Sequence, residues 1–98
     1  MIEILTFRLA PDASEEAFLA ADKRVQAEFA YRQPGLMRRT TARAENGEWV
    51  VIDLWRSAGD ADASDSRWGH DDATREFMTL VDRATLSTTR YRELDARD

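Results

Sequence analysis

The sequence predicts an α+β fold, and a central β-hairpin is the feature on which the rest of the prediction depends. Two strand-like runs flank Asn46-Gly47, the dipeptide that most strongly favours a tight hairpin turn with positive φ at both central residues. The second run, residues 49–55, is apolar or aromatic on both faces, as is typical of a central strand that is covered on two sides. Amphipathic helical patterns before and after the hairpin complete the prediction.

The first strand is predicted over residues 2–10, where Leu5, Phe7 and Leu9 share one face by strict alternation. A break at residues 11–14 follows, and Asp12 or Ser14 can cap the next helix.

That helix is predicted over residues 14–32. Its apolar side chains recur at helical spacing and form one buried stripe, made of Phe18, Ala21, Val25 and Phe29. The charged side chains between them are expected in solvent, namely Asp22, Lys23, Arg24 and Glu28. Pro34-Gly35 ends the helix and turns the chain.

The hairpin begins with a strand predicted over residues 36–45, and its many Arg and Thr residues favour the edge of a sheet. After the hairpin, Asp60 or Asp62 could cap a short helix. Asp71 or Asp72 then caps a second helical piece with one apolar stripe, made of Phe77, Leu80, Val81 and Ala84. A last strand is predicted over residues 86–93, which are rich in Thr and Tyr.

The resulting β-α-β-β-α-β order predicts a ferredoxin-like sandwich, in which two helices cover one face of a four-stranded sheet. The helices are expected to pack on Leu5, Phe7 and Leu9 together with Val50, Ile52 and Leu54. The opposite face would carry a mixed set: Ile4, Thr6, Arg8, Trp49, Val51, Asp53 and Trp55. Because that set is too apolar to stay in water, we expect a homodimer in which two copies bury it against each other.

Length and composition limit the possible classes of function. Ninety-eight residues suit a single domain, predicted over 1–98. The net charge is −5 with no Lys/Arg block, so nucleic acid is not an expected partner. No apolar run approaches the ~20 residues that a membrane span needs, so no membrane partner is expected. The absence of cysteine excludes a thiolate nucleophile and agrees with a cytoplasmic location.

Three segments resemble a known family. They are Gln33-Pro34-Gly35-Leu36 between helix and strand, residues 48–57 (EWVVIDLWRS) with Trp55 at the strand end, and the Ala/Asp-rich helix that follows directly. The chain is similar over nearly its whole length to the antibiotic-biosynthesis-monooxygenase-like superfamily of dimeric α/β-barrel proteins. The resemblance implies a homodimer whose two sheets form a barrel, with a ligand cavity between sheet and helices in each subunit.

Some members of that superfamily oxidise aromatic polyketides without metal or flavin, some degrade haem, and others are isomerases, decarboxylases or have no known activity. The haem-degrading branch has an Asn on the first strand, where Phe7 stands here, and a Trp that Trp68 matches. Its His would fall near Phe77-Met78, and His70 comes too early in the sequence. Haem degradation is therefore not expected, and the resemblance implies no cofactor.

His70 and Asp53 are the candidate catalytic residues. His70 is the only histidine, so any imidazole base must be this residue, although it could equally belong to a loop or a helix cap. Asp53 lies within an apolar strand, and a buried carboxylate must be paired or protonated. It is either half of a salt bridge at the dimer interface, with Arg8 or Arg39, or a general base with a shifted pKa.

Four aromatic residues are the candidate ligand contacts: Phe7, Trp55, Trp68 and Phe77. They could line a pocket on which a flat aromatic molecule stacks, or they could simply fill the core or a dimer interface. The first hypothesis is therefore a monooxygenase-like protein that binds or oxidises a small aromatic, polyketide-like molecule without metal or flavin. The alternatives are a non-catalytic ligand-binding or structural homodimer, and an interaction module whose sheet face binds another protein. No metal site is predicted, because one His and no Cys cannot supply the usual zinc ligands.

Overall fold

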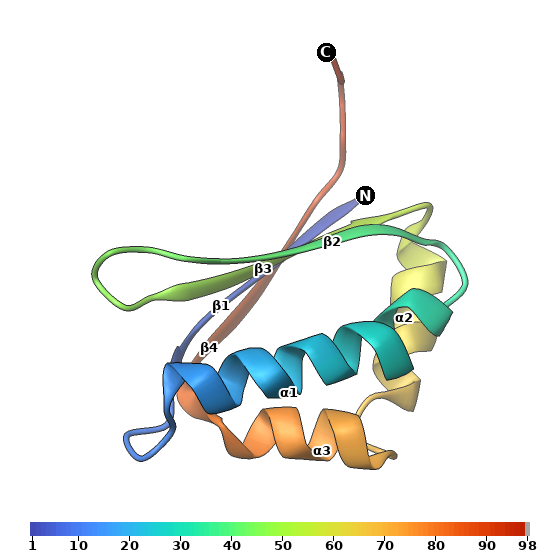
Figure 1. Ribbon diagram of the computed structural model, residues 1–98. Helices are drawn as coiled ribbons and strands as arrows, with labels where there is room; N and C mark the ends of the chain where they lie inside the picture. The colour runs from blue at the N-terminus through green and yellow to red at the C-terminus, as the bar shows by residue number, and fades with distance from the viewer. Residues whose placement is uncertain (98) are drawn as a thin grey trace.

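The chain forms a four-stranded sheet with three α-helices on one side, in the computed structural model that describes residues 1–97 (Figure 1). The elements in order are β1 (Ile2–Leu9), α1 (Glu15–Glu28), the 3-10 helix η1 (Ala30–Arg32), β2 (Leu36–Arg43), β3 (Trp49–Trp55), α2 (Ala58–Arg67), α3 (Asp72–Thr79) and β4 (Val81–Tyr91). The predicted β-α-β-β-α-β order is confirmed, with the second helical region divided into α2 and α3.

The sheet is antiparallel throughout, and its strand order is β2-β3-β1-β4. The polar strand β2 lies at an edge, as predicted. Helices α1 and α3 pack side by side beneath the sheet, while α2 crosses one end of this layer (Figure 1). This arrangement confirms the ferredoxin-like fold class.

The face that β3 turns toward the helices differs from the prediction. Leu5 pairs with Val51 and Phe7 with Trp49, so these four side chains share the helix-covered face. Asp53 and Trp55 belong to the same alternating set, whereas the set Val50, Ile52 and Leu54 points to the open face. The prediction was wrong because β3 is apolar on both faces, and alternation alone cannot then choose between them. Trp49 and Trp55 are both buried in the layer between the sheet and the helices.

The apolar core centres on Phe18 of α1, which is fully buried. Its ring centroid lies 5.6 Å from that of Phe7, 4.7 Å from that of Trp49 and 5.2 Å from that of Phe77. The predicted stripe of α1 is therefore confirmed.

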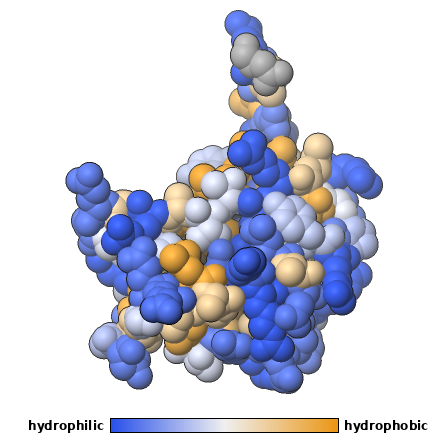
Figure 2. All heavy atoms as spheres, viewed as in Figure 1, coloured by the Kyte–Doolittle hydropathy of each residue, from blue (hydrophilic) through white to orange (hydrophobic). Residues whose placement is uncertain are grey.

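Hydrophilic residues cover most of the surface that is seen from the viewpoint of Figure 1 (Figure 2).

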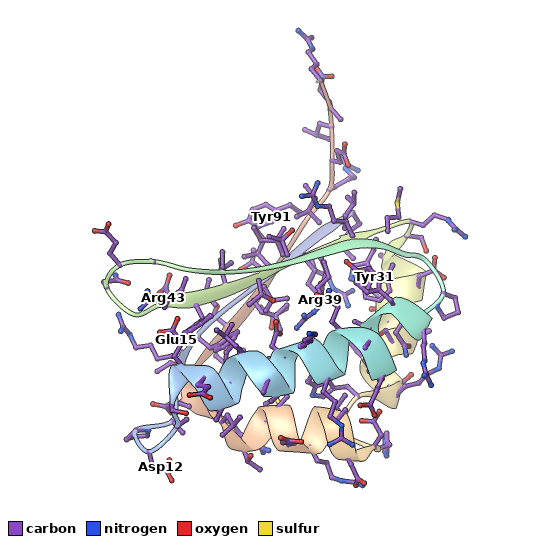
Figure 3. The ribbon with its side chains drawn as sticks, viewed as in Figure 1. Asp12, Glu15, Tyr31, Arg39, Arg43 and Tyr91 are labelled. Atoms are coloured by element: carbon purple, nitrogen blue, oxygen red, sulfur yellow. The ribbon has the colours of Figure 1, made fainter. Side chains whose placement is uncertain are left out.

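Asp22 is the exception on α1, because it is buried and not solvated as predicted. Its Oδ1 accepts a hydrogen bond from the guanidinium of Arg39 at 2.6 Å. A buried charge is tolerated when it is paired and hydrogen-bonded, and β2 supplies the partner across the layer (Figure 3).

The hairpin turn also differs in detail from the prediction. Gly47 has a φ of 90°, but no non-glycine residue among 1–97 has a positive φ, so Asn46 does not adopt the primed-turn conformation. Ala44 and Glu48 close a three-residue loop, since the Ala44 N–H donates to the Glu48 carbonyl at 2.7 Å and Gly47 N–H donates to the Ala44 carbonyl at 3.0 Å. This is the next most common hairpin solution, in which glycine takes the left-handed position.

The end of the second helical region was predicted too late. Helix α3 ends at Thr79, and β4 begins at Val81, so Val81 and Ala84 belong to the strand. The pairing of β1 with β4 is irregular between Thr6 and Arg8, where β4 has extra residues. There the Arg8 N–H donates to Thr85 Oγ1, and Ala84 N–H donates to Asp82 Oδ1. These local bonds stabilise the bulge. Val81 and Ala84 continue the helical spacing of Phe77 and Leu80, which is why the helix was predicted to extend too far.

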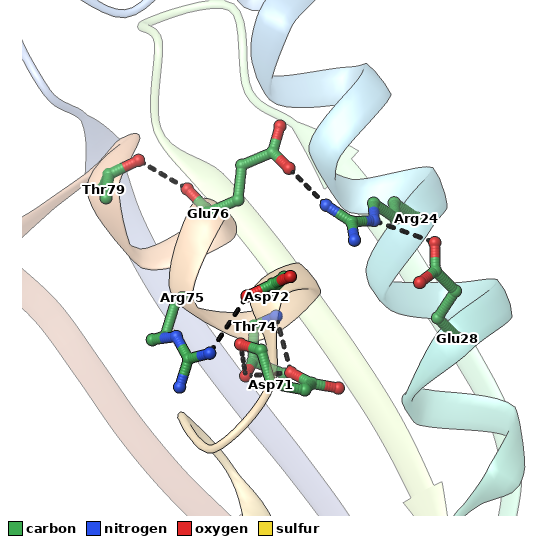
Figure 4. Close-up of polar contacts among 8 residues, drawn as sticks. All are labelled: Arg24, Glu28, Asp71, Asp72, Thr74, Arg75, Glu76 and Thr79. Carbon is green, nitrogen blue, oxygen red and sulfur yellow. Dashed lines mark hydrogen bonds and ion pairs between the residues drawn. The ribbon is translucent and has the colours of Figure 1, made fainter.

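Side-chain caps begin each α-helix. Ser14 caps α1 and Asp71 caps α3, each from the predicted pair of candidates, whereas α2 is capped by Ser57 and not by the predicted Asp60 or Asp62. At the start of α3, Asp71 accepts hydrogen bonds from the N–H and the hydroxyl of Thr74 (Figure 4). These bonds lower the pKa of Asp71. Arg24 of α1 binds Glu28 and also Glu76 of α3, and thereby links the two helices (Figure 4).

Candidate functional site

A cavity of about 350 Å³ lies between the sheet and the helices. Its lining comes from β1, β3, α3, β4 and the end of α2. Most of the lining is apolar: Leu5, Phe7, Trp55, Trp68, Phe77, Met78, Val81 and Leu86. Four polar residues complete it: Glu3, Asp53, Asp65 and Thr88. The volume is at the lower end of the range found for small-molecule sites, and a mostly apolar lining is typical of them.

The structure brings five of the six predicted site residues to this cavity. Phe7, Trp55, Trp68 and Phe77 line it, and so does Asp53. The Trp68 ring meets Phe77 edge to face, with centroids 5.7 Å apart and an interplanar angle of 88°. These rings form an aromatic wall, and their roles toward a ligand stay a prediction.

His70 does not line the cavity. It is exposed in the bend between α2 and α3, directly after Gly69, whose φ is 87°. Its sequence neighbours Trp68 and Asp71 have clear structural roles, the first in the cavity wall and the second as a helix cap. The cavity therefore has no imidazole in its wall.

Asp53 is the most unusual group in the cavity. Its Oδ1 is buried and accepts no hydrogen bond, and the nearest cationic atom is Arg39 Nε at 3.9 Å. Burial, against the opposing effect of Arg39 and with a smaller contribution from the charge of Glu3, raises the pKa of Asp53 to about 6. The carboxyl group is thus poised to gain or lose a proton near neutral pH.

Arg39 is one of the two partners predicted for Asp53, but the predicted location of the pair at a dimer interface was wrong. Asp53 faces the helices and not the open face of the sheet, so it cannot form a salt bridge at an interface made by that face. Arg39 is in turn held by Asp22, and its backbone N–H donates to the Tyr31 hydroxyl at 3.1 Å (Figure 3). The guanidinium is therefore committed mainly to the α1 side.

Trp55 carries a second buried polar atom without a partner. Its Nε1 finds no acceptor among the described residues, although the side chain is only 4% exposed. Leaving a buried donor or acceptor unpaired costs about 1–3 kcal/mol each. Two such atoms at positions 53 and 55, on one face of one strand, are more typical of a binding site than of a structural core.

An ion-pair network lies beside the polar residues of the cavity wall. Arg90 of β4 binds Glu3 of β1 at 2.8 Å, and it also binds Asp62 and Asp65 of α2 at 2.6 and 2.9 Å. The hydrogen bonds that Arg90 donates to Asp62 and Glu3 raise the pKa of Arg90. This network joins α2 to the sheet beside two residues of the cavity wall.

Part of the cavity lining was not predicted from the sequence. Glu3 could have been found, because it alternates with Leu5 and Phe7 on the predicted strand. Leu86 and Thr88 could also have been found, because they alternate within the strand predicted over residues 86–93. Val81 could not, since the sequence pattern assigned it to the preceding helix. Met78 and Asp65 become wall residues only through the packing of α2 and α3, which has no local signal.

The residues that the structure describes offer no obvious metal centre. No three His, Cys, Asp or Glu side chains within 1–97 converge as metal ligands would. Among the same residues, no helix has the length and apolar character needed to cross a membrane.

Comparison with known proteins supports the fold. No protein-family model matches the sequence, and no curated protein matches it significantly. The chain is similar to the crystal structure of SnoaB, a cofactor-independent oxygenase from Streptomyces nogalater, at a TM-score of 0.74 and 20% identity over 97% of this chain and 96% of that one.

Two further solved structures have the same fold. Rv0793 from Mycobacterium tuberculosis matches at a TM-score of 0.71 and 18% identity over 99% of this chain and 97% of that one. A protein from Nitrosomonas europaea, provisionally named an antibiotic biosynthesis monooxygenase, matches at a TM-score of 0.69 and 19% identity over 96% of this chain and 98% of that one. The chain therefore has the ferredoxin-like fold of the antibiotic-biosynthesis-monooxygenase-like proteins, as its sequence resemblance implied.

Proposed function

We propose that this protein binds a small aromatic molecule in the cavity and oxidises it with molecular oxygen, without metal or flavin. The observation that carries the proposal is one aromatic-walled cavity containing the carboxyl group of Asp53, whose buried Oδ1 accepts no hydrogen bond. The similarity to a cofactor-independent oxygenase supports the reaction class. A flat ligand would stack against the rings of Trp68 and Phe77.

In the proposed reaction, Asp53 accepts a proton from an activated C–H group of the ligand. The resulting carbanion transfers its electrons to oxygen and forms a carbon-bound peroxide, which takes up a proton. Loss of water then converts the original CH₂ group to a carbonyl, so the ligand plus O₂ yields the ketone plus H₂O. The ligand supplies all the electrons, and no outside reductant is needed.

The protein's contribution would be the base and the environment. A pKa of about 6 keeps Asp53 mostly ionised at neutral pH while leaving it basic enough to accept a proton. The apolar walls exclude water from the carbanion and position the ligand beside oxygen. Because His70 is exposed outside the lining, the proposal gives the proton-acceptor role to Asp53 alone.

Oxygen consumption tests this proposal. Two- and three-ring aromatic ketones and phenols with an activated CH₂ group would be screened with an oxygen electrode, and ¹⁸O₂ would label the new carbonyl. Replacing Asp53→Asn should lower the rate at least about 100-fold, the usual contribution of a general base. Asp12→Asn, in the exposed turn before α1 (Figure 3), is the matched control and should keep the full rate.

The alternative is a non-catalytic ligand-binding protein of the same fold. The observation that favours it is the 3.9 Å approach of Arg39 to Asp53, which gives that carboxylate a structural partner. Ligand binding without oxygen uptake, or uptake that Asp53→Asn leaves unchanged, would select this alternative.

We also propose a homodimer through the open face of the sheet. This face carries a groove lined by Ile2, Ile52 and Leu54 with Arg38 and Thr40, and Ile52 is 37% exposed. Tyr91 lies on the same side of the sheet, away from the helices (Figure 3). Sedimentation at micromolar concentration should give a dimer, and Ile52→Lys should give a monomer. A monomeric wild-type protein would overturn this proposal.

A further inference from the structure

The charged groups in the cavity wall are all acidic. Glu3, Asp53 and Asp65 line the cavity, and no Lys, Arg or His is among its lining residues. A charged ligand would therefore meet carboxylates first.

The nearby cations do not cancel this negative charge. Arg90 is shared among three carboxylates, namely Glu3, Asp62 and Asp65. Arg39 binds Asp22 at 2.6 Å and reaches Asp53 only at 3.9 Å. The polar end of the cavity thus keeps an excess of negative charge in a partly buried, low-dielectric setting, where charges interact more strongly than in water.

Hydrogen bonding adds a second criterion. An ionised carboxylate can only accept hydrogen bonds, and the buried Oδ1 of Asp53 receives none from the described residues. A ligand that brings an O–H or N–H group to Asp53 would supply the missing donor. The Nε1–H of Trp55 is a buried donor without an acceptor among the described residues. The oxygen of a neutral hydroxyl group on the ligand could accept this hydrogen bond.

We infer that the cavity selects aromatic ligands that carry a hydrogen-bond donor and no negative charge, and that it rejects aromatic carboxylates. This inference rests on the proposed function for its site, because it assigns the ligand class of the same cavity. It requires binding and not turnover, so the two can fail separately.

Four naphthalenes that differ in one substituent test the inference by calorimetry at pH 7.5, where Asp53 is mostly ionised. They are 1-naphthalenemethanol, its methyl ether, 1-naphthylmethylammonium and 1-naphthoate. The methyl ether should bind about tenfold more weakly than the alcohol, because it has lost the donor. The carboxylate should bind about thirtyfold more weakly than the alcohol, and the ammonium at least as tightly as the alcohol.

Three variants separate the charges that act. Asp53→Asn should bring the carboxylate to within about threefold of the alcohol, because it removes the nearest charge and supplies an amide donor. Asp65→Asn should reduce the difference in affinity between the alcohol and the carboxylate by a smaller factor. The Asp65 side chain is 62% exposed, so we expect the fold to tolerate this substitution. Asp12→Asn, outside the cavity, should keep the wild-type order of affinities.

The outcomes discriminate between the two proposals. Wild-type binding of the carboxylate as tightly as the alcohol would overturn the inferred selectivity and leave oxidation open. The expected order of affinities without oxygen uptake by any substrate would overturn the oxidation alone. Failure of all four ligands to bind would overturn both.

Discussion

The layer between the sheet and the helices has a filled half and a hollow half. In the filled half, Phe18 packs against three aromatic rings and is fully buried. In the hollow half, Trp68, Met78 and Leu86 surround a cavity of about 350 Å³. The same sheet covers both halves. Phe18 of α1 fills the first, whereas no residue of α1 lines the cavity, whose helix side comes from α3 and the end of α2.

Two carboxylates near one guanidinium make the contrast sharper. Asp22, toward the filled half, accepts a hydrogen bond from Arg39 at 2.6 Å. Asp53, in the hollow half, approaches the same side chain only to 3.9 Å and keeps a bare, buried oxygen. A satisfied buried polar group contributes to structural uniqueness, whereas an unsatisfied one persists at a cost that function explains better than folding does.

The largest expected effect comes from breaking the filled half. Phe18→Ala should lower the free energy of unfolding by about 4 kcal/mol, because a fully buried ring leaves a cavity. Met78→Ala in the hollow half should cost about 1 kcal/mol, since that side chain already borders empty space. Urea denaturation of both variants measures the difference. Equal losses would show that the two halves are packed alike.

Asp22→Asn should have the next largest effect. It removes the partner of a buried guanidinium, so the free energy of unfolding should fall by about 3 kcal/mol at pH 7.5. The exposed Asp72→Asn on α3 is the control, and a change within about 0.5 kcal/mol is expected there. A loss at Asp22 as small as this control would contradict a structural role for the pair.

Asp53→Asn should have a smaller effect of opposite sign to that of Asp22→Asn. We expect it to raise the free energy of unfolding by about 2 kcal/mol at pH 7.5. The folded protein holds the pKa of Asp53 above its unfolded value, so the protonated carboxyl is favoured in the folded state. Its stabilising contribution is complete below about pH 4 and is lost as the pH rises through about 6.

The charged groups that act on Asp53 are Arg39, Glu3, Asp22 and Asp65. Unfolding curves of wild type and Asp53→Asn between pH 4 and 8 measure the effect. The gain in stability of the variant over the wild type should grow between about pH 4 and pH 6, stay constant above about pH 6 and vanish toward about pH 4. A difference in stability that does not change with pH would show that the Asp53 carboxyl has an ordinary pKa.

Sequence patterns predicted most of the architecture because the signals were local. The helical stripe of Phe18 and Val25 and the break at Pro34-Gly35 depend only on neighbours in the chain. The orientation of β3 depended on which of two apolar faces the helices cover, and that is decided by packing between distant segments. The start of β4 was lost because Val81 and Ala84 continue the helical spacing of Phe77 and Leu80.

The cavity was predicted only in part for a related reason. Phe7, Trp55, Trp68 and Phe77 were chosen as large aromatic residues that the family resemblance favours, and their meeting at one cavity follows from the fold. The bare oxygen of Asp53 and the commitment of Arg39 to Asp22 are tertiary facts. The sequence also drew attention to His70 only because it is the single histidine, which says nothing about where a turn directs it.

Strand β3 has a practical consequence for changing this protein. Its odd positions face the helices, and two of them, Asp53 and Trp55, line the cavity. Its even positions, including Ile52 and Leu54, face the open side of the sheet. Because the two sets alternate along one backbone, selection or design could alter one without touching the other. Ligand preference and self-association could then evolve as separate traits, even though both depend on side chains of the same seven-residue strand.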